Sequence, residues 1–236
     1  MSLTRHIVWD WNGTLFDDFD ISVTAASAAC VEVGGAPIEG EAYRRCFTRP
    51  VRTFYERLLE RAVSDDQWHT IVDTYHSNYT RQIPLARLRH RAKEVLAELA
   101  ASGVTHSLLS MGEHEEVVAL VEQWGISESF LIAEGVRHHQ GRTDSKQQAL
   151  KEHLALLQGL SGTPLLPSQV VLIGDTLDDL EAANAAGTVC VLLDDGSYDP
   201  SLVGELGLTV ANGLEAAAEA GLRLLPEVLP EGSSRT

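Results

Sequence analysis

From residue 86 onward, short apolar runs of strand length alternate with segments of helical periodicity. The alternation favours a parallel sheet with helices on both faces, so the predicted fold class is α/β. The expected strands are residues 104–109, 130–133, 169–173 and 188–193. The expected helices are residues 86–102, 113–124, 145–158, 178–186 and 213–224.

A further apolar run, residues 6–9, stands near the N-terminus and ends at Asp10. The segment that follows it has helical patterning as far as Pro84. We therefore expect a core domain made of residues 1–16 and 85–236, and a helical cap domain of residues 17–84. An insertion directly after the first strand lies over the carboxyl end of the sheet, where ligands bind in such folds. The cap is therefore placed to act as a lid.

Composition and charge exclude several classes of partner. The formal net charge is −16, and such a surface repels nucleic acid and anionic lipid, so neither is an expected partner. No apolar run approaches the roughly 20 residues of a membrane helix. Cys30, Cys46 and Cys190 lie far apart and outside any CxxC pattern, which argues against a disulfide framework or a structural zinc site. We expect a cytoplasmic protein, as a monomer or a homodimer.

Four separated elements carry side chains suited to chemistry, each at the end of a predicted strand or on the helix that follows one. They are Asp10-Trp11-Asn12-Gly13-Thr14-Leu15, Ser110, Lys146 and Gly174-Asp175-Thr176-Leu177-Asp178-Asp179. Taken singly, each has a simpler interpretation as a turn, a helix N-cap, a solvated lysine or a strand-to-helix cap. Their joint occurrence in this order is harder to explain by those roles.

With these motifs, the sequence resembles the haloacid dehalogenase superfamily, specifically its phosphoglycolate-phosphatase-like branch with a helical cap inserted after the first motif. The resemblance covers about residues 5–225, and the run GDTLDDLEAANAAG is close to the fourth motif of that branch. It implies a Rossmann-like parallel sheet with an inserted α-helical cap. It also implies a phosphohydrolase that acts on a small phosphorylated metabolite through an aspartyl-phosphate intermediate.

The resemblance further implies roles for individual residues. Asp10 would be the nucleophile, and Lys146 would offset the negative charge that it shares with the phosphate. Mg²⁺ would be held by the carboxylates of Asp10 and Asp175 and by the backbone carbonyl of Asn12. Asp179 would bind the ion or one of its waters. The residues expected to bind the phosphorylated substrate from the core are Thr14, Ser110, Met111 and Gly112.

The sequence departs from the family pattern at two positions. Phosphatases of the superfamily usually carry Asp two residues after the nucleophile, as general acid and base, but this chain has Asn12. An amide has no titratable proton near neutral pH and cannot do that work. Met111 replaces the Asn that commonly follows the Ser or Thr of the second motif.

The cap contains no lysine, which argues against a phosphonatase, and the retained Asp175 and Asp179 argue against a dehalogenase.

Asn12 leaves alternatives to a phosphomonoesterase open. One is a phosphotransferase or a hydrolase of activated phosphates, in which the leaving group needs no proton, and another is a low-activity protein that binds a phosphorylated ligand.

In the cap, Arg49 and Arg52 lie near a predicted turn and suit a substrate carboxylate or a second phosphate. A solvated charged face is the simpler interpretation of these arginines. His138 and His139 are interpreted as an exposed loop rather than as metal ligands.

Overall fold

The structure is a computed structural model, and it describes residues 5–137, 145–161 and 165–226. Six strands form one sheet in the order β5-β4-β1-β6-β7-β8, and all pairs are parallel. They are β1 (His6–Trp9), β4 (Thr105–Glu113), β5 (Ala133–Val136), β6 (Val170–Gly174), β7 (Val189–Leu193) and β8 (Val210–Ala211). The predicted α/β class with a Rossmann-like parallel sheet is therefore confirmed.

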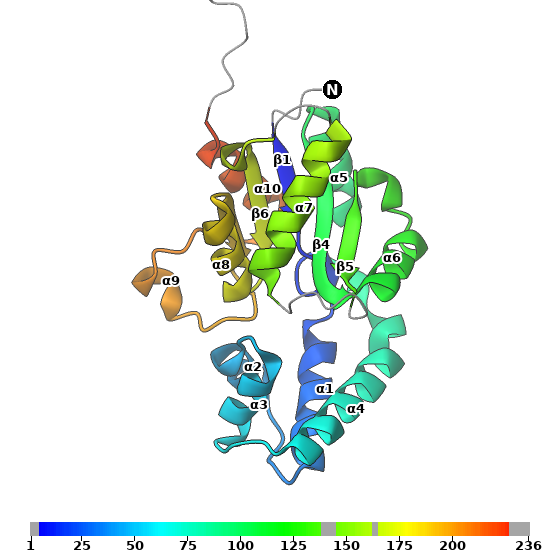
Figure 1. The fold of residues 1–236 in the computed structure, drawn as a ribbon, viewed down its shortest axis with the longest axis vertical. Helices are drawn as coiled ribbons and strands as arrows, with labels where there is room; N and C mark the ends of the chain where they lie inside the picture. The colour runs from blue at the N-terminus through cyan, green and yellow to red at the C-terminus, as the bar shows by residue number, and fades with distance from the viewer. Residues whose placement is uncertain (1–4, 138–144, 162–164, 227–236) are drawn as a thin grey trace, which may run out of the picture.

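Helices cover both faces of the sheet (Figure 1). One face carries α5 (Ala92–Ala101), α6 (His114–Gln123) and α10 (Gly213–Leu224), and the other carries α7 (Lys146–Ser161) and α8 (Leu177–Ala186). Central strand β1 is buried along its whole length: Ile7 and Trp9 face the first set of helices, and Val8 faces the second. Burial on both faces explains why Ile7 to Trp9 form a continuous apolar run rather than an alternating one.

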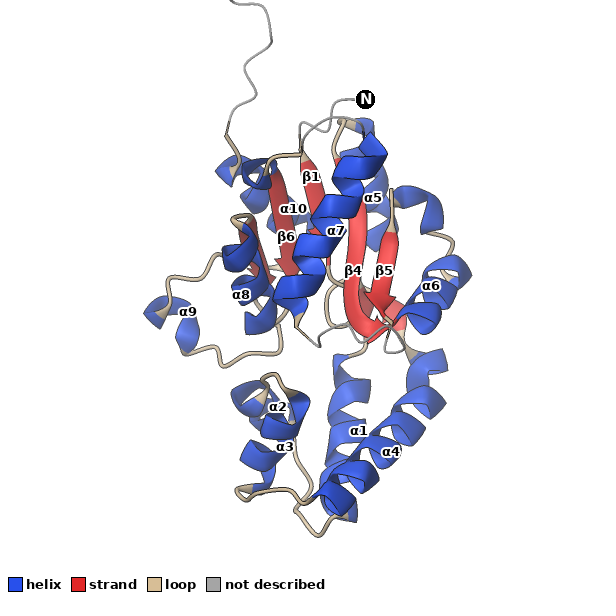
Figure 2. Cartoon of the chain, in the orientation of Figure 1, coloured by secondary structure: helices blue, strands red, loops and turns tan. Residues whose placement is uncertain are grey.

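A helical unit lies beyond the carboxyl edge of the sheet (Figure 2). It consists of α1 (Phe19–Glu32), α2 (Gly40–Cys46), α3 (Val51–Leu59) and α4 (Asp65–Gln82), and α1 packs along α4. The unit has an apolar core of its own, formed around Ala29, Phe54 and Ile71. None of the helices in the described part of the chain is long and apolar enough to cross a bilayer.

Several element boundaries differ from the predicted ones. The helix expected over 86–102 begins at Ala92, because Arg87–Leu88 form strand β3, antiparallel to β2 (Phe16–Asp17). Strand β4 continues past residue 109 to Glu113, and β5 lies a few residues after the predicted run 130–133. Short elements such as β8, the helix α9 (Leu202–Glu205) and the 3-10 turn η1 (Ile83–Leu85) were not predicted. Elements of two to four residues show no measurable periodicity in a sequence.

Candidate active site

A tight loop after β1 presents Asp10 at the carboxyl edge of the sheet. The Asp10 amide donates to the carbonyl of Ile173 on β6 at 2.9 Å, which continues the strand pairing to the first residue of the loop. Gly13 turns the loop back with φ +71°, and a Cβ at this position would lie 2.3 Å from Oδ2 of Asp175. Only glycine satisfies both conditions, so Gly13 allows Asp175 to approach the loop closely.

Three carboxylates and one ammonium form a buried cluster at the ends of β1 and β6. Ligand oxygens of Asp10, Asp175 and Asp179 lie within 4.8 Å of one another. The ammonium of Lys146, at the start of α7, contacts both Asp10 and Asp179. With all four groups ionised, the cluster has an excess of two negative charges in a buried site, which matches the charge of a divalent cation.

The pKa shifts in this cluster follow from burial and from the mutual repulsion of its carboxylates. Burial raises the pKa of Asp10 to about 7, even though the Lys146 ammonium acts in the opposite direction. Burial also raises the pKa of Asp175 well above its usual range, and the charges of Asp10 and Asp179 add to that rise. Burial alone would lower the pKa of Lys146, but its two carboxylate partners outweigh it and the net shift is upward. A cation bound between the carboxylates would relieve this repulsion.

The carboxylates differ in how much capacity they have left to bind an ion. Oδ2 of Asp179 accepts hydrogen bonds from the Thr176 hydroxyl at 2.6 Å and from the Thr176 backbone amide at 3.0 Å, and these bonds belong to the N-terminal cap of α8. Oδ1 of Asp179 contacts the Lys146 ammonium. Oδ2 of Asp10 accepts a longer hydrogen bond, from the Thr14 hydroxyl at 3.3 Å, and Oδ1 contacts Lys146. Asp10 is therefore better placed for direct coordination than Asp179, which suits a contact through water. The Thr14 hydroxyl thus points at the Asp10 carboxylate.

The second motif lies beside this cluster, on β4. The hydroxyl of Ser110 is 3.4 Å from Oδ1 of Asn12, and it accepts from the backbone amide of Gly112 at 2.9 Å. Met111 is half-buried between them. The structure thus brings Ser110 and Gly112 next to the Asp10 loop, although the Gly112 amide is bonded to Ser110 in this conformation.

Asn12 is held by two residues that the sequence analysis did not single out. Its amide nitrogen donates to Oδ2 of Asp18 and to the hydroxyl oxygen of Tyr79, both at 2.8 Å. The Tyr79 hydroxyl in turn donates to Asp18 at 2.5 Å. Tyr79 lies on α4, 61 residues after Asp18, so only the docking of the helical unit onto the sheet brings the three together.

The two cap arginines expected to bind substrate lie in different places. Nε of Arg49 is 3.1 Å from Oδ2 of Asp178, next to the acidic cluster. Arg52 instead pairs with Asp65 at 2.8 Å and donates to the carbonyl of Val63, both within the helical unit. The structure therefore brings Arg49 toward the candidate site and does not bring Arg52 there. The predicted loop of His138 and His139 lies outside the described residues.

Two further arginines hold the loops around the site. Arg89 donates to the carbonyls of Thr14 at 2.9 Å and Gly13 at 2.6 Å, so it supports the loop that carries Asp10. Arg44 of α2 donates to the carbonyl of Gly196 at 3.0 Å and links the helical unit to the core. Arg89 was not a candidate from the sequence, because its acceptors are backbone carbonyls far away in the chain.

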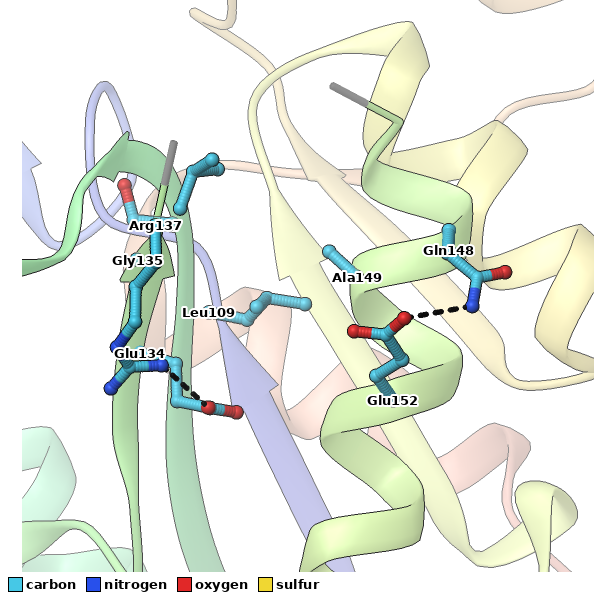
Figure 3. Close-up of a pocket in the computed structure, with 9 residues that line it drawn as sticks. Leu109, Glu134, Gly135, Arg137, Gln148, Ala149 and Glu152 are labelled. Atoms are coloured by element: carbon cyan, nitrogen blue, oxygen red, sulfur yellow. Dashed lines mark hydrogen bonds and ion pairs between the residues drawn. The ribbon is translucent and has the colours of Figure 1, made fainter. Parts of the chain in front are cut away.

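A pocket adjoins the site between β4, β5 and α7 (Figure 3). Ser110 forms one wall, and the remaining lining residues are Leu109, Glu134, Gly135, Val136, Arg137, Gln148, Ala149 and Glu152. The guanidinium of Arg137 and the carboxylate of Glu134 approach to 3.6 Å, and the Gln148 amide donates to Glu152 at 2.9 Å. The charged and amide side chains that line the pocket therefore pair with one another.

Comparison with known proteins identifies the family of the chain. The sequence model described as haloacid dehalogenase-like hydrolase matches residues 7–193. A phosphoglycolate phosphatase of Pseudomonas fluorescens (strain Pf-5) is 25% identical over 99% of this chain and 88% of its own length. A phosphoglycolate phosphatase of Yersinia pestis is 28% identical over 81% of this chain and 82% of its own length.

Solved structures show the same fold at lower identity. A haloacid dehalogenase-like hydrolase from Streptococcus pneumoniae superimposes with a TM-score of 0.74 at 19% identity, over 92% of this chain and 97% of that one. Protein tyrosine kinase A of Mycobacterium tuberculosis superimposes with a TM-score of 0.72 at 21% identity, over the same shares. At such identities the similarity establishes the fold alone. The family match over most of the chain goes further: this protein belongs to the haloacid dehalogenase-like hydrolases.

Proposed function

We propose that the chain is a Mg²⁺-dependent phosphohydrolase that uses Asp10 as its nucleophile on a small phosphorylated metabolite. The observation that carries this proposal is the buried cluster of Asp10, Asp175, Asp179 and Lys146 at the carboxyl edge of the sheet. The phosphoglycolate phosphatases among the relatives support the same substrate class. The donor set also fits, because carboxylate oxygens are the ligands that Mg²⁺ prefers.

The proposed reaction has two steps on Asp10. In the first, a carboxylate oxygen of Asp10 attacks phosphorus and the bond from phosphorus to the leaving-group oxygen breaks, which leaves an aspartyl-phosphate. In the second, water attacks the same phosphorus, so that inorganic phosphate leaves and the carboxylate is restored. Lys146, already in contact with Asp10, offsets negative charge in both steps. When bound by Asp10, Asp175 and the Asn12 carbonyl, Mg²⁺ would let an anionic nucleophile approach an anionic phosphate.

We propose the helical unit, residues 17–84, as a lid over this site. The chain enters and leaves it through β2 and β3, which pair over two residues each and offer a short hinge. Arg44 and Arg49 contact the core in this conformation. An anionic group of the substrate would compete with Asp178 for the Arg49 guanidinium, so Arg49 would bind that group when it leaves Asp178.

Measuring phosphate release from a panel of phosphorylated metabolites, phosphoglycolate included, tests the proposal. With Mg²⁺ we expect turnover of at least one small phosphate ester, and after EDTA treatment we expect none. Asp10→Asn should abolish the activity, whereas Asp20→Asn, at an exposed position on α1, should retain it. Phosphate bound to the acid-quenched enzyme should be released by hydroxylamine, as an acyl phosphate is. Absence of Mg²⁺-dependent release across the panel would refute the proposal.

A second candidate, hydrolysis or transfer of activated phosphates, is favoured by Asn12. An amide cannot protonate a leaving alkoxide, and loss of a general acid typically costs about 10²–10⁴ in rate. Acyl and aryl phosphates leave as weak bases and scarcely need that proton. We therefore expect rates to fall steeply as the pKa of the leaving group rises, and added alcohol to accept phosphate from Asp10. A flat leaving-group series would show that another group supplies the proton.

A further inference from the structure

The side chain of Asn12 is held in one orientation by a closed set of hydrogen bonds. Both protons of its amide nitrogen have acceptors, one on Asp18 and the other on the Tyr79 oxygen, each at 2.8 Å. The Tyr79 hydroxyl donates a hydrogen bond to Oδ2 of Asp18 at 2.5 Å. The backbone amide of Gly13 donates to the other Asp18 oxygen at 2.8 Å. Asp18 is buried, so water does not compete for these bonds.

The chemistry of the partners decides which end of the Asn12 amide faces which way. An ionised carboxylate can only accept hydrogen bonds, so Asp18 selects the nitrogen of Asn12 and turns the oxygen away. That oxygen, Oδ1, then lies 3.4 Å from the hydroxyl of Ser110, on the side of the second motif. With the amide reversed, its oxygen would face the carboxylate oxygen of Asp18, which is repulsive.

We propose that Asp18, together with Tyr79 from the cap, is a positioning residue that fixes the Asn12 oxygen as a hydrogen-bond acceptor toward the reacting phosphate. This inference rests on the proposed function. In that reaction the Asn12 oxygen would accept a hydrogen bond from the water that attacks the aspartyl-phosphate, and so orient it. The family usually has a carboxylate at position 12, whereas here the amide occupies that position and the carboxylate lies one contact away, on Asp18.

Tyr79 makes this arrangement depend on cap docking. It lies on α4, whereas Asp18 immediately precedes α1 and Asn12 belongs to the core loop. Movement of α4 away from the core would remove the Tyr79 oxygen, one of the two acceptors of the Asn12 amide. The oxygen of Asn12 is therefore fixed most firmly when the cap is closed over the core.

Nuclear magnetic resonance of the Asn12 side chain tests the orientation without relying on activity. The two protons of its amide, assigned by their loss in Asn12→Asp, should exchange slowly with solvent in the unmodified chain. Asp18→Ala and Tyr79→Phe should each speed that exchange at least tenfold. Tyr75→Phe is the matched control, because Tyr75 stacks on Tyr79 from the same helix but its hydroxyl bonds to Ser22. Unchanged exchange in Asp18→Ala would overturn the inference.

Kinetics with para-nitrophenyl phosphate and Mg²⁺ test the consequence for the reaction. Asp18→Ala should lower kcat about 10- to 100-fold with KM changed less than about threefold, since misplacing a catalytic group by about 1 Å can cost 10²-fold. Asn12→Asp alone places two carboxylates against each other. The exchanged pair Asn12→Asp with Asp18→Asn restores a donor and an acceptor, and should exceed the Asn12→Asp single variant at least tenfold in kcat.

The outcomes separate this inference from the proposed function. Additive effects of the changes at positions 12 and 18 on kcat would mean that Asp18 does not act through Asn12, and would overturn the inference. Lack of any Mg²⁺-dependent hydrolysis by the unmodified chain would instead refute the proposed function. In that case the exchange rates of the Asn12 amide would still decide whether Asp18 fixes its orientation.

Discussion

Replacing Lys146 by methionine removes the ammonium that lies between Asp10 and Asp179 in the acidic cluster. Methionine has a similar length and no charge, so Asp10 and Asp179 would keep their burial and lose their shared partner. Removing one member of a buried ion pair costs about 3–5 kcal/mol. In a chain of this size each kcal/mol changes Tm by roughly 2–4 °C. We therefore expect Tm in EDTA to fall by roughly 6–20 °C.

Mg²⁺ should reverse much of that loss in the Lys146 variant. The substitution raises the excess negative charge of the cluster from two to three, so the variant should bind the ion more tightly than the unmodified chain. An ion at 100 times its Kd stabilises a protein by about 2.7 kcal/mol, and tighter binding gives more at equal concentration. The assay is thermal unfolding in EDTA and across a Mg²⁺ titration, and kcat should be lost throughout.

Lys151→Met is the matched control for this experiment, because Lys151 is exposed on the same helix. It should change Tm by less than about 2 °C in either buffer, as surface substitutions usually cost within about 0.5 kcal/mol. Two results would refute the reasoning: a loss below about 1 kcal/mol for Lys146→Met in EDTA, or equal responses of the variant and the unmodified chain to Mg²⁺. Either would mean that the ammonium does not balance the cluster.

Three further predictions address the loop, the cap and pH. Gly13→Ala should weaken Mg²⁺ binding at least tenfold in calorimetric titrations, because the new Cβ would lie 2.3 Å from Asp175. Gly207→Ala is the control: Gly207 also has positive φ, but its Cβ would have no atom within 4 Å, so the substitution should cost only about 1 kcal/mol of stability. For a substrate with a carboxylate, Arg49→Ala should raise KM about tenfold or more. Arg52→Ala should lower Tm and leave KM unchanged. Equal effects of the two substitutions on KM would contradict the different placement of the two arginines. In EDTA, Asp10 should lower the free energy of unfolding as pH rises from about 4 to about 7, because its folded carboxyl, with a pKa raised from 3.8 to about 7, holds a proton that the unfolded chain has released. Buried His6 and His106, with pKa values lowered to about 3 and about 4, act in the opposite direction, so the Asp10 contribution is the difference in slope between the unmodified chain and Asp10→Asn. Urea titrations at several pH values measure this slope, and Mg²⁺ should reduce it.

The gathering of the four motifs follows directly from the order of elements. Asp10 and Asp175 follow strands that are neighbours in the sheet, and the carboxyl ends of parallel strands meet at one edge. Helix-period and strand-period patterns are long enough in these segments to be distinguished. The final helix, predicted over 213–224, has those bounds in the structure. A sequence pattern thus suffices where regular elements carry the chemistry.

The support of the Asn12 side chain could not be derived in the same way. Asp18 and Tyr79 meet because α1 packs along α4, and Tyr79 reaches Asn12 because the helical unit docks on the core. Neither strand nor helix periodicity in the sequence indicates such packing. Arg89 was also missed, because the predicted helix over 86–102 made it a helical residue. In the structure it precedes α5 and donates to a backbone carbonyl of the Asp10 loop. Arg49 and Arg52 have the same charge and lie three positions apart, yet only the packing of α3 decides that the second pairs inside the cap.

The central position of β1 has a consequence for synthesis on the ribosome. His6 pairs with Thr105 on one side and with Val170 on the other, so the first strand made has no partner in the sheet until much of the chain has been translated. At about 5–20 residues per second, the second pairing becomes available only roughly 10–30 s after β1. Helices α1 to α4 contact each other over short stretches of chain and can pack during that interval. The helical unit can therefore pack before the sheet beneath it is complete, while β1 waits for β4 as its first partner in the sheet and for β6 as its second.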